Sequence, residues 1–298
     1  MPAATPKKRH TFSRHVAPLA PVALALLMQS ASPGGGGGTA MKTTTQETSP
    51  VSAPAESGFV ESCPNPLFPS PDQTTIDETS CTIAGSGGAE TFQNEAKNNF
   101  CAVGPAKAKT ISDLVNLQAK VEQDVTIPFG NTRSHGTHPH GPATNRKPLQ
   151  DLGEGTLVTL QGFVLIARQE GAESVNCGKN VDDKSTNHDI HISIVAAPGQ
   201  DECSGVVAEM IPHHRPADWT EQNVNAVGSK KLPVRLTGQL FFDSSHSPCK
   251  SGVPSSGDPK RIALWEVHPI YDFEVCTQGD CSDGKGWETL DQFASSNK

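Results

Sequence analysis

The hydrophobic and polar positions of residues 154–276 alternate in five segments that predict β-strands. These segments are Thr156–Arg168, His188–Ala196, Gly205–Ile211, Leu232–Asp243 and Ile262–Cys276. In the fourth, every second residue from Val234 to Phe242 is apolar or glycine, which gives it one buried face. A helical pattern, Pro216–Val227 with Asp218 as its expected cap, lies between the third and fourth segments.

Five strands with one helix between the third and the fourth follow the order of an OB-fold. Gly162 and Gly238 lie in the middle of the two long strands, where a missing Cβ lets a small barrel bend sharply. Pro269 is expected at a bulge or on an edge. The sequence thus predicts a mainly β fold, a five-stranded OB-like barrel over residues 154–281, with residues 282–298 as a C-terminal tail.

A shorter segment, residues 61–153, precedes the predicted barrel. Glu90–Ala102 and Ile111–Gln123 are expected helices, and Ser112 is placed to cap the second. Two helices are too few for a core of their own. We therefore expect a small helical, disulfide-linked N-terminal extension that packs on the barrel.

The first 60 residues have the composition of an export signal and a linker. Residues 1–32 combine four basic residues, a 13-residue apolar stretch from Val16 to Met28, and the small residues Ser30 to Ser32. A membrane span needs about 20 apolar residues, so a cleaved signal is favoured over an anchor, and no transmembrane span is expected in the mature chain. Residues 33–60 have almost no apolar side chains and are expected to be disordered. The predicted location is secreted or periplasmic.

Cysteine usage agrees with export, because an even number of cysteines in an exported chain favours disulfide bonds. The eight disulfide candidates are Cys63, Cys81, Cys101, Cys177, Cys203, Cys249, Cys276 and Cys281. Cys177 and Cys249 lie in loops expected to flank one barrel face, so their pairing is reasonable. Cys276 has two possible partners, Cys281 and Cys203.

The charge of the chain argues against nucleic acid as a partner. The formal net charge is −8, and removal of the four basic residues of the signal takes it to −12. Residues 154–281 hold 17 acidic and 10 basic residues, so a basic groove would need unusual clustering. Outward-facing aromatic residues are also few, with Phe163 and Phe241 as the main candidates.

Strand alternation places several polar side chains on the outer face of the barrel, where OB-folds usually bind ligands. The candidate ligand-binding residues are Asp189, His191, Glu209, Glu266 and His268. Imidazole and carboxylate groups suit zinc and similar divalent ions, which makes His191 and His268 candidate metal ligands. A solvated polar face stabilised by cross-strand pairs is the competing interpretation.

A second group of histidines, His135, His138 and His140, lies in the loop SHGTHPHG at residues 134–141. Histidine-rich tracts bind metals, although a loop rich in glycine and proline does not preorganise them. The chain has no HExxH, GxSxG or Walker-type sequence, and no GxGxxG after a strand. We therefore identify no catalytic residue, and a divalent metal is the one cofactor that the sequence raises.

The segment 154–276 resembles the OB-fold superfamily in strand order. It also resembles a set of uncharacterised secreted bacterial proteins that pair an "H-I" strand with a later "E-x-H-P" strand. The corresponding residues here are Asp189–Ile192 and Glu266–Pro269. The resemblance implies a fold and no defined activity.

These observations lead to three hypotheses of function. The first is an exported, non-catalytic binding or structural module of the cell envelope, whose partner is an envelope component or a small ligand. The second is a metal-dependent hydrolase that uses the histidines and carboxylates of the barrel face. The third is oligosaccharide binding, which OB barrels also support.

Overall fold

The computed structural model describes residues 81–86, 91–124, 146–171, 173–177, 188–213, 215–250, 255, 257–278 and 280–298. All of them belong to the second of two units into which the chain divides, Met1–Ser52 and Ala53–Lys298. The expected export signal, the linker and the histidine loop with His135, His138 and His140 lie outside the described residues.

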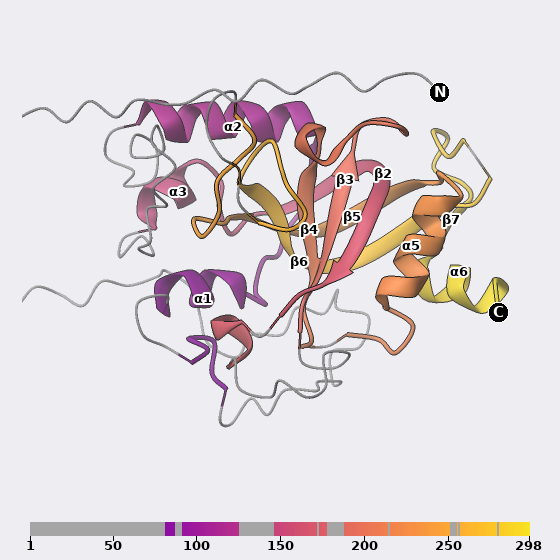
Figure 1. Cartoon of the computed structure of the whole chain (residues 1–298), viewed down its shortest axis with the longest axis horizontal. Coiled ribbons are helices and arrows are strands. Elements are labelled where there is room, and N and C mark those ends of the chain that lie inside the picture. The colour runs from indigo at the N-terminus through magenta and orange to yellow at the C-terminus, as the bar shows by residue number, and fades with distance from the viewer. Residues whose placement is uncertain are drawn as a thin grey trace, which may run out of the picture. The chain divides into compact units, whose positions relative to one another are not determined.

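Five strands close into the predicted barrel (Figure 1). They are β2 (Leu157–Gln169), β3 (Ile190–Val195), β4 (Val206–Met210), β5 (Pro233–Phe242) and β6 (Trp265–Cys276). The pairing order is β2-β3-β4-β6-β5, and β5 returns to β2 with Leu160 opposite Leu236. The β4–β6 pair is parallel and the other four are antiparallel. Helix α5 (Glu221–Ser229) lies between β4 and β5 in the chain, so the fold is the expected OB-like barrel.

The interior of the barrel consists of the alternate apolar residues that the sequence indicated. Ile190, Ile192 and Ile194 of β3 and Val206, Ala208 and Met210 of β4 all belong to the main core cluster. Burial of such aliphatic side chains contributes about 1.5–3 kcal/mol each and is the main stabilising term of the barrel.

The two mid-strand glycines serve two different purposes. At Gly162 a Cβ atom would approach Cγ2 of Ile194 to 2.6 Å, so glycine allows β2 and β3 to pack closely. At Gly238 the register of β5 against β6 shifts, and a Cβ atom would collide with the Pro269 carbonyl. Pro269 therefore lies at the expected bulge, next to His268.

The segments before and after the barrel contribute elements that the sequence did not predict. Strand β1 (Lys107–Lys109) pairs in parallel with β2, and β7 (Trp287–Thr289) pairs with β6. Helix α6 (Leu290–Ser296) buries Leu290 and Phe293 in the main core, so part of the expected C-terminal tail packs on the barrel. A short helix, α3 (Lys147–Asp151), precedes β2.

Two predicted helix caps are wrong, each by two residues. Helix α2 (Ile111–Gln123) has the predicted bounds, but Thr110, not Ser112, caps it in a reciprocal bond pair with Asp113. Helix α5 begins after Thr220, which replaces Asp218 as the cap. In both cases a threonine directly before the helix binds the backbone N–H three residues later.

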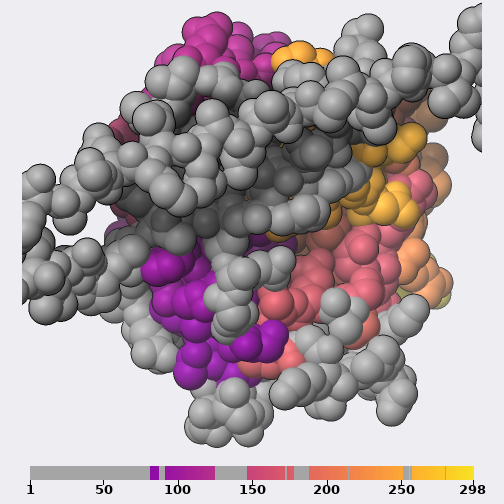
Figure 2. Space-filling model, turned by 60° about the vertical axis from the view of Figure 1, so that its left-hand side comes forward, coloured from indigo at the N-terminus to yellow at the C-terminus, as the bar shows by residue number. Residues whose placement is uncertain are grey.

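The N-terminal extension covers the outer face of the barrel. Helix α1 (Thr91–Lys97) lies against β5 and β6, because Gln239 Nε2 donates to the carbonyl oxygens of Ala96 at 2.7 Å and His268 at 2.6 Å. The hydroxyl of Tyr271 donates to the carbonyl oxygen of Asn99 at 2.7 Å. Figure 2 shows the violet atoms of the α1 region beside the salmon atoms of the middle strands. The extension therefore lies over the face where OB barrels usually bind ligands.

Three disulfide bonds join described cysteines: Cys81–Cys177, Cys203–Cys249 and Cys276–Cys281. The predicted pairing of Cys177 with Cys249 is wrong. Cys177 is bonded to Cys81 of the extension, and Cys249 is bonded to Cys203, directly before β4. Of the two alternatives for Cys276, the short loop to Cys281 is confirmed. Cys101 is also disulfide-bonded, and Cys63 lies outside the described residues.

Among the described segments, no helix has both the length and the apolar character that crossing a membrane requires.

Candidate metal centre

Three neighbouring strands bring the predicted site residues together on the outer face of the barrel. His191 of β3 lies directly opposite Glu209 of β4. Ala208 of β4 pairs with Val267 of β6, which makes Glu209 and His268 neighbours across that pair. Asp189 comes directly before β3. Alternation therefore placed these four side chains on the correct face.

The same side chains are buried, although alternation alone would leave them in water. Asp189, Glu209 and His268 are 0% exposed and His191 is 3% exposed. The cover consists of α1 and of the short helix η3 (Ser174–Asn176), which Cys81–Cys177 ties to the extension. A solvated polar face is therefore not what the barrel presents here.

His268 has one nitrogen fixed by the backbone and one directed at carboxylates. Its Nδ1 lies 3.1 Å from the carbonyl oxygen of Lys97, which can only accept, so Nδ1 carries a proton. Its Nε2 lies 2.9 Å from Oε2 of Glu209 and 3.6 Å from Oδ2 of Asp189. The ring orientation is that of a metal-binding histidine held by a backbone carbonyl.

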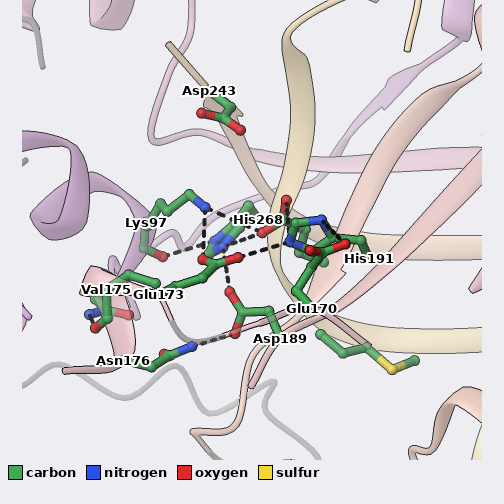
Figure 3. Close-up of polar contacts among 12 residues, drawn as sticks. Lys97, Glu170, Glu173, Val175, Asn176, Asp189, His191, Asp243 and His268 are labelled. Carbon is green, nitrogen blue, oxygen red and sulfur yellow. Dashed lines mark hydrogen bonds and ion pairs between the residues drawn. The ribbon is translucent and has the colours of Figure 1, made fainter. Parts of the chain in front are cut away.

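His191 repeats this arrangement on the neighbouring strand. Its Nδ1 lies 3.3 Å from the carbonyl oxygen of Asp258, and its Nε2 lies 3.2 Å from Oε1 of Glu209 and 3.3 Å from Oε1 of Glu173. Figure 3 shows Lys97, Glu173, His191 and His268 pointing toward one another. Glu209 thus directs one carboxylate oxygen to each imidazole.

The extension and the β2–β3 connection supply residues that the sequence analysis missed. Lys97 places Nζ 3.5 Å from both Glu173 Oε2 and Glu209 Oε2. Asn176 Nδ2 donates to Oδ1 of Asp189 at 2.9 Å. Glu170 Oε1 lies 3.4 Å from His191 Nδ1. The barrel order places the β2–β3 loop at the rim of this face, which was a usable signal for Glu170 and Glu173, but nothing in the sequence indicated Lys97.

Glu266 separates from the other predicted residues and belongs to an adjoining buried group. Arg261 Nη1 lies 2.7 Å from Glu266 Oε2 and 3.4 Å from Asp243 Oδ2. His246 Nε2 lies 3.3 Å from the same Asp243 oxygen. The Arg261 guanidinium already serves these two carboxylates, so Glu266 is not a strong metal ligand.

Burial and charge act in opposite directions on the pKa values of the site. Burial alone would lower the pKa of His268, but the negative charge of Glu209 and contacts with Asp189 outweigh it and raise the pKa to about 9. The pKa of His191 is raised well above its usual value in the same way, against the effect of burial, by Glu209 and Glu173. Burial would raise the pKa of Glu209, but His191, Lys97 and His268 hold it well below its ordinary value. The carboxylate of Glu209 is therefore ionised and attracts positive charge.

Five buried atoms at the centre form no hydrogen bond with any described group. They are Asp189 Oδ2, His191 Nε2, Glu209 Oε1, Glu209 Oε2 and His268 Nε2. Buried polar atoms nearly always have a partner, so five together require an explanation. The nitrogen–oxygen distances are short enough for ion pairs but the directions do not suit hydrogen bonds. Atoms that converge without bonding one another are arranged as the ligands of a cation.

Among the described residues, the potential ligand atoms form three groups, and within each group all atoms lie within 4.8 Å of one another. The groups are Glu173, Asp189 and His191; Asp189, Glu209 and His268; and Glu209, Asp243 and Glu266. The first two combine imidazole nitrogen with carboxylate oxygen, a donor set suited to zinc and other first-row divalent ions. The third group contains only carboxylates, and two of them, those of Asp243 and Glu266, form ion pairs with Arg261.

Phe241, one of the two aromatic residues considered for stacking, is buried. Its ring centre lies 5.5 Å from that of His268 and 5.1 Å from the Arg146 guanidinium carbon. Phe241 is therefore not available to stack on a nucleic-acid base or a sugar ring.

Comparison with known proteins gives no family for the chain. No family model and no curated protein matches it. One solved structure, described as an aspartyl-tRNA synthetase from Leishmania major Friedlin, is similar to 59% of this chain at 8% identity with a TM-score of 0.23. The match spans 21% of that protein's length, about a fifth, and carries no argument about this chain.

Proposed function

We propose that the chain is an exported, non-catalytic OB-barrel module of the cell envelope that binds a divalent cation of the zinc class. One observation carries the proposal: two buried imidazole Nε2 atoms face carboxylates without forming hydrogen bonds. Histidines that bind a metal through one ring nitrogen are usually oriented by a hydrogen bond on the other. Both histidines have such a contact, from Nδ1 to a backbone carbonyl oxygen.

The charge of the cluster supports a cation of this kind. The cluster contains two cationic side chains, those of Lys97 and Arg215, and the charge of Arg215 interacts with Asp189. It contains four carboxylates, those of Glu170, Glu173, Asp189 and Glu209. The formal excess of two negative charges must be neutralised, because an uncompensated buried charge is costly. One divalent cation does so, and protonation of both imidazoles is the alternative.

The export signal pattern of residues 1–32 and the disulfide bonds support a location outside the cytoplasm, since such bonds persist in oxidising compartments. We also propose membership of the secreted bacterial proteins that share the "H-I" and "E-x-H-P" strands. Both sequences contribute to the cluster, the first through Asp189 and His191 and the second through His268.

The experiment uses the full chain, purified without a histidine tag, with its disulfide bonds intact and its metal removed by a chelator. Added Zn²⁺ should raise the thermal midpoint by several degrees, because a ligand that binds only the native state stabilises it. Asp189→Asn, which removes a carboxylate shared by both groups of ligands, should abolish the rise, and His268→Gln should reduce it. Glu274→Gln, whose carboxylate pairs with Arg235 elsewhere on the barrel, is the matched control and should keep it. A midpoint indifferent to Zn²⁺, Mn²⁺ and Co²⁺ would contradict the proposal.

A metal-dependent hydrolase is the second candidate, and the partial exposure of one edge of the cluster favours it. The side chains of Glu170 and Glu173 are 25% and 22% exposed, while the other carboxylates are fully buried. A substrate would reach a bound cation from this edge. Turnover of a phosphate or carboxylic ester by the zinc-loaded protein, lost in His191→Ala, would favour the enzyme over the non-catalytic module.

A further inference from the structure

The two imidazoles of the cluster belong to different groups of potential ligands. His191 lies with Glu173 and Asp189, and His268 lies with Asp189 and Glu209. No group among the described residues contains both histidines. Two ligands of one zinc ion are at most about 4.2 Å apart, twice the usual zinc–nitrogen distance. The structure therefore offers two neighbouring positions for a cation, each with its own imidazole.

Two carboxylates connect these positions. Asp189 belongs to both groups of ligands. Glu209 places Oε1 3.2 Å from His191 Nε2 and Oε2 2.9 Å from His268 Nε2, so its two oxygens face the two positions. Carboxylates that reach two positions at once are what a pair of metal ions about 3.5–4 Å apart requires.

The ligands are held from outside by the rest of the fold. Each imidazole has its Nδ1 next to a backbone carbonyl oxygen, that of Asp258 for His191 and that of Lys97 for His268. Asn176 donates to Oδ1 of Asp189 and fixes that carboxylate. Outer partners of this kind orient metal ligands. Both cation positions have ligands oriented by such outer partners, so the fold supports each position separately.

We infer that the centre is binuclear, with one divalent cation on His191 and Glu173, a second on His268, and Asp189 and Glu209 bridging them. This inference rests on the proposed cation binding and names its stoichiometry and ligands. Lys97 lies 3.5 Å from Glu173 and from Glu209, beside the proposed pair of cations.

The test is the metal content of the full, disulfide-bonded chain. Protein loaded with excess Zn²⁺ and freed of unbound metal is measured by native mass spectrometry and elemental analysis. We expect two ions per chain in the unmodified protein, one in Glu173→Gln and one in His268→Gln. Glu274→Gln, outside the cluster, should keep two. Circular dichroism identifies any variant that has not folded.

Loading with Mn²⁺ gives a second measurement that needs no variant. Two manganese ions bridged by carboxylates are exchange-coupled, so the electron paramagnetic resonance spectrum should show a coupled multiline signal. One ion per chain, with the spectrum of an isolated Mn²⁺, would overturn the binuclear inference and leave the proposed function standing. No retained metal, together with a thermal midpoint that added cations do not move, would overturn both.

Discussion

The carbonyl oxygen of Lys97, the last residue of α1, accepts a hydrogen bond from Nδ1 of His268 at 3.1 Å. One residue of the N-terminal extension thereby orients a histidine of the barrel, while its ammonium group lies between Glu173 and Glu209. The extension is thus part of the site and not only its cover.

Replacing Lys97 by methionine should destabilise the metal-free protein by about 3 kcal/mol, because it leaves buried carboxylates without their partner. The pKa of Lys97 is raised despite burial, chiefly by Glu173 and Glu209, which shows that the ammonium form is favoured. Bound Zn²⁺ should recover part of the loss. Urea unfolding measures both effects. Lys147→Met, which removes an exposed lysine paired with Asp151, is the control and should change stability by less than about 1 kcal/mol. Equal losses in the two variants would contradict the assigned role.

The stability of the metal-free protein should fall as the pH rises from about 6.5 to about 9. The pKa of His268 is raised to about 9, so its contribution is fully present below the unfolded value near 6.5 and is lost as the pH passes through 9. The raised pKa of His191 acts in the same direction. The contribution of His268 is up to about 3 kcal/mol.

Urea titrations at a series of pH values test this dependence. His268→Gln should flatten the decline, and saturation with Zn²⁺ should remove most of it, because a metal-bound imidazole no longer binds that proton. Metal-free protein whose stability does not fall between pH 7 and 9 would show that the imidazoles are neutral in the folded state.

The fold was predictable from the sequence because apolar residues recur at alternate positions in the barrel strands, most clearly in β3 and β5, and because the helix α5 falls between the third and the fourth of these strands. The same alternation placed Asp189, His191, Glu209 and His268 on one face. It could not show that this face is buried, since the cover comes from α1 and η3, whose docking depends on long-range contacts such as Gln239 with Ala96. Strand alternation also could not separate Glu266 from the other four residues. Glu266 forms an ion pair with Arg261, and the loop conformation that brings Arg261 there is not indicated by any local sequence pattern.

Gly238→Ala should destabilise the protein by about 2 kcal/mol and weaken metal binding. The new Cβ would meet Cγ1 of Val267 at 2.6 Å and collide with the Pro269 carbonyl, at the bulge that sets the direction of His268. Gly171→Ala is the matched control, because among the described residues no atom outside its chain neighbours lies within 4 Å of the position of its Cβ. Calorimetric titration with Zn²⁺ and thermal unfolding measure the two effects. Unchanged affinity in Gly238→Ala would mean that the bulge does not position His268.

Removing the Cys81–Cys177 disulfide should lower both stability and cation affinity. Cys177 directly follows η3, next to Asn176 and near Glu173, and its bond spans 96 residues of sequence. In the chain-entropy description a bond of that span contributes about 4.7 kcal/mol, and a bond across five or six residues contributes about 2 kcal/mol. The paired serine variant of Cys81 and Cys177 should therefore unfold more readily than that of Cys276 and Cys281, whose bond closes a short loop outside the cluster.

Zinc affinity distinguishes the two variants further. It should fall at least tenfold in the first variant, where the loop carrying Glu173 and Asn176 is released, and stay unchanged in the second. Equal zinc affinity in both variants would show that the extension shields the cluster without holding its ligands.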